Sequence, residues 1–197
     1  QITHAEAGVA AFSVSAMDGS LAYVSNNQLF LVKAGSEESV LIADGNNVDP
    51  ATEDFIFHGF VDAPSFSPDG ETLAYAFDGL HLYNVASGED QHVLTNLGNL
   101  LGESFVFSLE AYYPGAWSPD GKHIVTGGKD GSVRYWDPEG EPAAPYAILN
   151  KPIWPPLGPA FPPDGESLLA VTWQPAGFRL KSPQRSTGAP PSPTPIM

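Results

Sequence analysis

Hydrophobic and polar residues alternate along short segments of this chain, and most of these segments end at a Gly, Pro, Asn or Asp turn signal. Alternation with a period of two puts successive side chains on opposite faces of the backbone, so it predicts strands rather than helices. The clearest stretch predicts strands at 115–117, 123–126, 132–136 and 146–149. Asp130-Gly131 lies between the second and third strands and is a strong hairpin signal. Residues 115–149 are therefore predicted to form one four-stranded sheet.

The same order of elements recurs along the chain. Two further stretches each predict a four-stranded unit, and a last stretch from about 161 to 180 predicts a shorter unit. The strands of one four-stranded unit lie at 63–66, 73–77, 80–85 and 92–94. Three strands of the other are located, at 21–24, 28–32 and 40–42, and the last unit has strands at 168–171 and 178–180.

A turn motif marks each repeat. Ser-Pro-Asp-Gly stands at 67–70 and 118–121, and degraded copies of the motif, each keeping its Asp-Gly pair, stand at two further places. The four pairs begin at Asp18, Asp69, Asp120 and Asp164, with separations of 51, 51 and 44 residues. Pro presets φ, Asp bonds nearby amides and Gly accepts positive φ, so we expect these Asp residues to form structural turns. A repeat of this length suits an array with one sheet per repeat.

Residues 127–137, ending in the Trp136-Asp137 dipeptide, resemble the second half of a WD40 blade. In such blades a His forms a hydrogen-bonded set with a turn Asp, a strand hydroxyl and the Trp. Asp130, Thr126 and Trp136 match three members, but Glu110–Pro114 stands where the Gly-His pair is expected. The Ser-Pro-Asp-Gly openings resemble TolB-type (PD40) repeats and the propellers of prolyl-oligopeptidase-like enzymes, so the looser TolB-like class is favoured.

The resemblance implies an all-β fold: a β-propeller, or part of one, with about four four-stranded blades over residues 1–180. Residues 181–197 are rich in Pro and have little apolar surface, which predicts an extended tail or linker. The fourth unit is then expected to lack an outer strand.

Composition narrows the function classes. The chain has 8 basic and 23 acidic residues, a net charge of −15, and residues 1–178 alone hold 5 basic against 23 acidic residues. Such a surface repels phosphate backbones, so we expect no nucleic-acid partner. There is no cysteine, and no apolar run approaches the roughly 20 residues of a membrane-spanning helix. The start at Gln1 and the lack of Asn-x-Ser/Thr acceptors favour a periplasmic or extracellular bacterial protein.

The long connection at 43–62 is a candidate calcium site. Carboxylate and amide oxygens in flexible loops are suitable calcium ligands, although the spacing is not that of an EF-hand. The alternative is a solvated acidic loop. The candidate ligands are Asp44, Asn46, Asp49, Glu53 and Asp54.

Two other regions are candidate contacts for a protein partner. Leu100 and Leu101 lie in the second long connection, at 96–114, and long loops on a rigid scaffold often carry recognition. Trp154 stands between prolines in a connecting segment, where a bulky apolar side chain can anchor a partner. The alternative is that Trp154 packs internally, as Trp117 and Trp136 are expected to do.

No pattern typical of catalysis stands out. The chain has no Gly-x-Ser-x-Gly elbow, and its five histidines show no metal-ligand spacing. We therefore expect a non-catalytic scaffold that binds another protein, without a cofactor. Two alternatives remain open: an accessory propeller of an exported peptidase or other hydrolase, and a propeller that binds calcium or a small ligand.

Overall fold

The chain divides into two compact units in a computed structural model, Gln1–Asn96 and Leu97–Met197. The structure describes residues 5, 7–47, 61–77, 79–95, 113–127, 132–138, 147–150, 156–163, 165, 167–172, 178–181 and 194–195.

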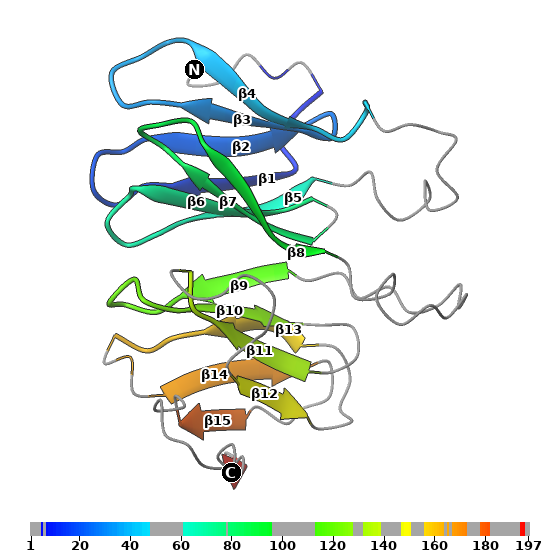
Figure 1. The fold of residues 1–197 in the computed structure, drawn as a ribbon, viewed down its shortest axis with the longest axis vertical. Helices are drawn as coiled ribbons and strands as arrows, with labels where there is room; N and C mark the ends of the chain where they lie inside the picture. Colours follow the sequence, from blue (N-terminus) through cyan, green and yellow to red (C-terminus); the bar gives the residue numbers. More distant parts are fainter. Residues whose placement is uncertain are drawn as a thin grey trace. The chain divides into compact units, whose positions relative to one another are not determined.

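The described residues of the first unit form two antiparallel sheets of four strands (Figure 1). In each sheet, neighbours along the chain are neighbours in the sheet, so the strand orders are β1-β2-β3-β4 and β5-β6-β7-β8. The strands of the first sheet are Ala11–Val14 (β1), Leu21–Ser25 (β2), Gln28–Val32 (β3) and Ser39–Asp44 (β4). Those of the second sheet are Asp62–Phe66 (β5), Thr72–Ala76 (β6), Gly79–Asn84 (β7) and Asp90–Thr95 (β8).

The described part of the second unit repeats this arrangement in two more four-stranded antiparallel sheets. The third sheet contains Tyr113–Trp117 (β9), Ile124–Gly127 (β10), Ser132–Trp136 (β11) and Ala147–Asn150 (β12). The fourth contains Pro156–Ala160 (β13), Ser167–Thr172 (β14), Phe178–Lys181 (β15) and Thr194–Pro195 (β16). The predicted all-β organisation in four-stranded sheets is therefore confirmed for the described residues.

The fourth sheet differs from expectation at its outer edge. We expected no strand after β15, yet β16 pairs with it, with Arg179 opposite Thr194 and Phe178 opposite Pro195. Proline lacks an N–H donor but can occupy an edge strand, where its nitrogen faces away from the ladder. Two residues of the Pro-rich segment thus complete a sheet.

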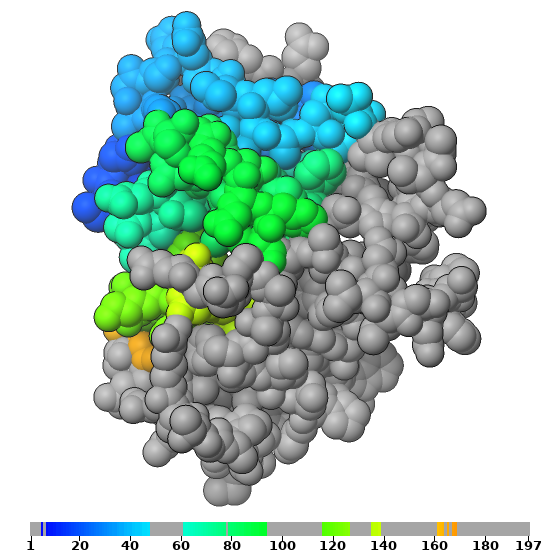
Figure 2. Space-filling model, in the orientation of Figure 1, coloured from blue at the N-terminus to red at the C-terminus, as the bar shows by residue number. Residues whose placement is uncertain are grey.

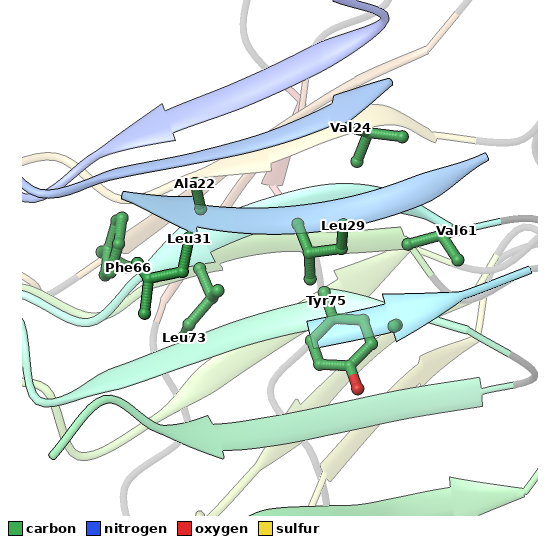
Figure 3. Close-up of a cluster of buried hydrophobic side chains, with 9 residues drawn as sticks. Ala22, Val24, Leu29, Leu31, Val61, Phe66, Leu73 and Tyr75 are labelled. Carbon is green, nitrogen blue, oxygen red and sulfur yellow. The ribbon is translucent and has the colours of Figure 1, made fainter. Parts of the chain in front are cut away.

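The first unit has its core between its two sheets (Figure 3). One face of the first sheet, here called the covered face, meets the second sheet. Leu29 and Leu31 on this face are at most 1% exposed, and they form one buried cluster with Leu73 and Tyr75 of β6. The covered face consists of Ala11, Ser13, Ala22, Val24, Leu29, Leu31, Val40 and Ala43.

The two sheets also meet at their motif turns. The Ser13 hydroxyl oxygen accepts a hydrogen bond from the Phe66 backbone N–H at 3.2 Å. Gly70 has a φ of +72°, and a Cβ added there would lie 2.7 Å from Ser15 Oγ and 3.3 Å from Met17 Cβ. Glycine at this position satisfies both the backbone conformation and the close approach of the neighbouring turn.

The second unit shows the same kind of contact between β9–β12 and β13–β16. The buried Tyr135 ring meets the Phe161 ring edge-on, with centroids 6.2 Å apart. A Cβ added to Gly165 would lie 3.5 Å from Pro119 Cδ, so one motif turn again lies beside the next. Phe161 and Phe66 both stand just before their repeat's turn motif. Within each unit, one sheet therefore packs against the next through equivalent positions.

Candidate functional site

The Ser-Pro-Asp-Gly turns have the same hydrogen bonds in the second and third sheets. The buried Ser67 hydroxyl donates to Asp69 Oδ1 at 2.5 Å and accepts from the Thr72 N–H at 2.9 Å. Ser118 repeats this with Asp120 Oδ1 at 2.6 Å and the His123 N–H at 3.0 Å. These Asp carboxylates thus bind within their own turns.

The hydrogen bonds also change the acidity of the motif carboxyls. The Ser67 hydroxyl lowers the pKa of Asp69 below its ordinary value, and the Glu71 N–H adds to the effect. The Ser118 hydroxyl lowers the pKa of Asp120 in the same way. Donors that stabilise a carboxylate favour its charged form, so both turns are strongest when these groups are ionised.

The first sheet makes its turn differently. Its sequence, Ser15-Ala16-Met17-Asp18, has one more residue between Ser and Asp than the Ser-Pro-Asp motif. Asp18 therefore bonds to Ser20, accepting from its N–H at 3.0 Å and from its hydroxyl at 2.7 Å. The Ser20 N–H is the main cause of the lowered pKa of Asp18. The fourth motif aspartate, Asp164, lies outside the described residues.

In the third sheet, Trp136 is held by a buried hydrogen bond from its indole Nε1–H to Thr126 Oγ1, 2.8 Å long. Trp136 is 3% exposed and Thr126 is 0% exposed. This Trp–hydroxyl pair joins β10 to β11 and leaves no indole donor unpaired in the core. Asp130, the turn residue expected to join the set, lies outside the described residues.

The predicted calcium site is only partly described. Asp44 Oδ1 accepts from the Asn46 N–H at 3.0 Å, and the Asn46 side-chain amide donates to the Asn26 carbonyl at 2.7 Å. Both side chains thus take part in the turn that follows β4. Asp49, Glu53 and Asp54 lie outside the described residues. Within the part of the chain that is described, no three His, Asp or Glu side chains are grouped as metal ligands.

The predicted partner contacts Leu100, Leu101 and Trp154 also lie outside the described residues, so they remain predictions.

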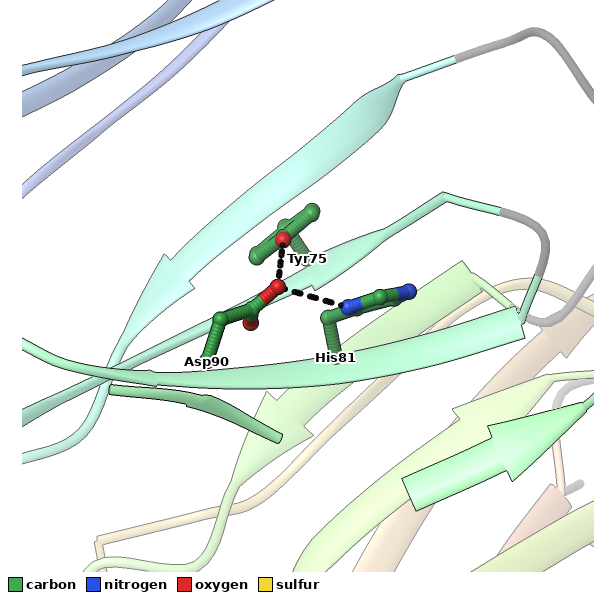
Figure 4. Close-up of polar contacts among 3 residues, drawn as sticks. All are labelled: Tyr75, His81 and Asp90. Carbon is green, nitrogen blue, oxygen red and sulfur yellow. Dashed lines mark hydrogen bonds and ion pairs between the residues drawn. The ribbon is translucent and has the colours of Figure 1, made fainter. Parts of the chain in front are cut away.

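A polar cluster on the second sheet was not predicted as a site (Figure 4). Asp90 Oδ2 accepts a hydrogen bond from the Tyr75 hydroxyl at 2.7 Å and lies 3.0 Å from His81 Nδ1. The His81 ring lies between two others, with centroids 4.9 Å from the Tyr75 ring and 4.3 Å from the His92 ring. The side chains of His81 and Asp90 are 12% and 33% exposed, so the cluster reaches the surface.

The cluster keeps Asp90 ionised and Tyr75 neutral. Burial acts to raise the pKa of Asp90, but the hydrogen bonds from His81 and Tyr75 outweigh it and hold this pKa below its ordinary value. Burial, with the hydrogen bond to Asp90, raises the pKa of Tyr75. A phenol that stays protonated is a hydrogen-bond donor, and here it serves to fix strand β6 to strand β8.

The sequence match to a known protein family lies almost entirely in the second unit. Residues 95–137 match the family model of the WD domain, G-beta repeat. Residues 95–137 are therefore similar to a WD40-type repeat. The match includes β9, β10 and β11, and it ends on the Trp136-Asp137 dipeptide. No curated protein sequence matches the chain.

Among the described residues, no helix is long and apolar enough to cross a membrane.

Proposed function

We propose that this chain is a non-catalytic protein-interaction scaffold, with its four-stranded sheets acting as the blades of a β-propeller or of part of one. The WD40-type repeat supports this proposal, since such repeats generally mediate protein contacts. The observation that carries it is the packing of one sheet against the next through equivalent residues within each unit, as Phe66 and Phe161 do. Stacked sheets give a rigid framework on which loops and outer faces can recognise a partner.

The Ser-Pro-Asp-Gly turns extend the proposal. Because Ser67 and Ser118 bind their Asp in the same way, these blades are closer to TolB-type repeats in their turns than to WD40 blades that use the full Gly-His set. The scaffold proposed here combines both features.

Affinity capture tests the function. The immobilised chain is incubated with an extract of its source cells, and retained proteins are identified by mass spectrometry. A Leu31→Asp variant, which places a charge in the 1%-exposed core position, is the matched unfolded control. We expect a protein retained in stoichiometric amount by the folded chain and lost with the variant. Equal retention by both proteins, or a hydrolytic activity of the purified chain, would contradict a non-catalytic scaffold.

A further inference from the structure

The first sheet has a second apolar face, opposite its covered face, here called the open face. Two cross-strand rows run across it in register, Phe12–Tyr23–Phe30–Leu41 and Val14–Leu21–Val32–Ser39. Phe12 is 69% exposed, Val14 53% and Leu41 48%. In the central strands of the same rows, Tyr23 and Val32 are buried, and Tyr23 stacks on Phe30 with centroids 5.3 Å apart. Strand β4 reaches the surface of the unit (Figure 2).

The second sheet shows what such a face normally contacts. Phe66 stands just before the motif serine of its repeat, as Val14 does in the first. Phe66 is 8% exposed because the covered face of the first sheet packs against it, whereas Val14 is 53% exposed. Phe12, Val14 and Leu41 therefore expose apolar side chains of the kind that the second sheet packs away, and exposed apolar patches of this kind mark interaction sites.

Charge indicates what kind of partner fits. Residues 1–96 contain 14 acidic residues and one basic residue, Lys33, a net charge of −13, whereas residues 97–197 contain 9 acidic and 7 basic residues, a net charge of −2. The eight residues of the open face are uncharged, but exposed Asp18, Glu37 and Glu38 lie in the turns that border its Val14–Ser39 row. Carboxylates at the rim favour a basic partner and oppose a second copy of this chain.

The area of the face limits the partner's size. Four strands spaced about 4.8 Å apart and about five residues long cover roughly 300 Å², well below the ~800 Å² that each side of a standard interface buries. A short segment can cover such a face, whereas a stable dimer needs more surface.

We propose that the open face binds a short segment of a partner protein in which apolar side chains alternate with Lys or Arg. This inference rests on the proposed scaffold function and assigns it a surface. The apolar side chains of the segment cover Phe12, Val14 and Leu41. Its basic side chains lie beside Asp18, Glu37 and Glu38 at the rim.

Fluorescence anisotropy on the full chain tests the proposal with two labelled peptides, one alternating Leu with Lys and one alternating Leu with Glu. Adjacent residues of β4 give a matched pair of variants, because Leu41 and Val40 are 48% and 47% exposed but lie on opposite faces of the sheet. We expect the Leu-Lys peptide to bind, and Leu41→Ser or Phe12→Ser to weaken it by about tenfold. Val40→Ser should change the affinity by less than about twofold.

A second pair of variants tests the charged rim. Glu37→Gln combined with Glu38→Gln should weaken the Leu-Lys peptide, whereas Glu71→Gln, an exposed position in the turn of the second sheet, should not. Equal losses at both places would indicate general attraction to an acidic protein and overturn the proposal. So would equal binding of the Leu-Glu peptide, or no binding of either.

Other occupants give different results. If the open face joins two copies of the chain, sedimentation velocity will show a dimer that Leu41→Ser dissociates, and the proposal is overturned. Affinity capture separates this proposal from the scaffold function. If the folded chain captures a protein that Leu41→Ser does not release, the scaffold function stands and this surface is excluded. If the folded chain captures no protein, the scaffold function is excluded.

Discussion

The first and second sheets have equivalent faces in different surroundings. Tyr23 and Tyr75 hold corresponding places in β2 and β6. Tyr23 stacks on Phe30 within the open face, whereas Tyr75 lies in the buried cluster between the two sheets. Val14 and Phe66 differ in the same way, with 53% and 8% of their surface exposed. The repeat therefore supplies an apolar face to each sheet, and only the neighbouring sheet makes that face part of a core. On the first sheet, Phe12, Val14 and Leu41 of this face are exposed instead, and the proposed docking surface rests on them.

The largest expected effect comes from identical substitutions on the two faces of the first sheet. Leu31→Ala removes a side chain that is 1% exposed, and it should lower the free energy of unfolding by about 2–5 kcal/mol. Leu41→Ala, at 48% exposure, should cost less than about 1 kcal/mol. Urea denaturation followed by circular dichroism measures both. Similar losses for the two variants would show that the open face is packed in solution.

The next comparison uses equivalent glycines of the motif turns. Gly19 and Gly70 have φ values of +81° and +72°, so alanine should cost each about 1–2 kcal/mol in backbone strain. Gly70→Ala should cost more than Gly19→Ala, because its Cβ meets Ser15 Oγ whereas nothing lies within 4 Å at Gly19. The difference in melting temperature between the two variants measures the contact between adjacent turns. If the two variants have the same melting temperature, the adjacent turns are not in contact.

A smaller effect is expected from the motif serine. Ser67→Ala leaves the Thr72 N–H and the Asp69 carboxylate without their shared partner, so it should destabilise the protein by about 1–2 kcal/mol. The exposed Ser36, which accepts the Glu38 N–H at 3.0 Å, is the control, and Ser36→Ala should cost less than about 0.5 kcal/mol. Chemical denaturation in parallel checks the pair. A loss at Ser36 as large as that at Ser67 would show that burial does not strengthen the turn.

The smallest expected effect is on how the stability of the protein falls at acid pH. Because the folded-state pKa values of Asp69 and Asp90 are lowered, their contribution to stability is present above their ordinary pKa of about 4 and is lost as the pH falls through the folded values. The free energy of unfolding, measured from neutral pH to about pH 3, should therefore decrease. In the Asp90→Asn variant, this free energy should decrease less steeply. An unchanged slope in Asp90→Asn would mean that this carboxyl has the same pKa folded and unfolded.

The sequence predicted strands and turns well because both are set locally. Alternation and turn signals placed β3 at 28–32 and β11 at 132–136, the bounds that the structure has. The Tyr75–Asp90–His81 cluster could not be predicted. Its members are separated by up to 15 residues, and a register shift between Leu80 and His81 decides that His81 faces His92. Alternation places His81 on the opposite face from Leu80 and Leu82, as the register does, but it does not identify the partners of His81.

The sequence also could not predict which face of the first sheet is exposed. Phe12 and Val14 alternate with Ala11 and Ser13, which predicts two faces but does not say which of them another sheet covers. That depends on contacts between residues about 50 positions apart, such as the Ser13–Phe66 hydrogen bond. The edge strand β16 escaped prediction for a similar reason, since a Pro-rich segment gives no strand pattern.

The most direct test uses the fact that the chain has no cysteine of its own. Single variants Val14→Cys and Phe66→Cys place one thiol at equivalent positions before the turns of the first and second sheets, and maleimide labelling under native conditions measures its accessibility. We expect the thiol at position 14 to react nearly as fast as in urea. The thiol at position 66 should react at least about a hundredfold more slowly, because it is reached only when the sheets open. Equal native rates at the two positions would contradict the claim that one sheet covers the next while the first sheet stays open.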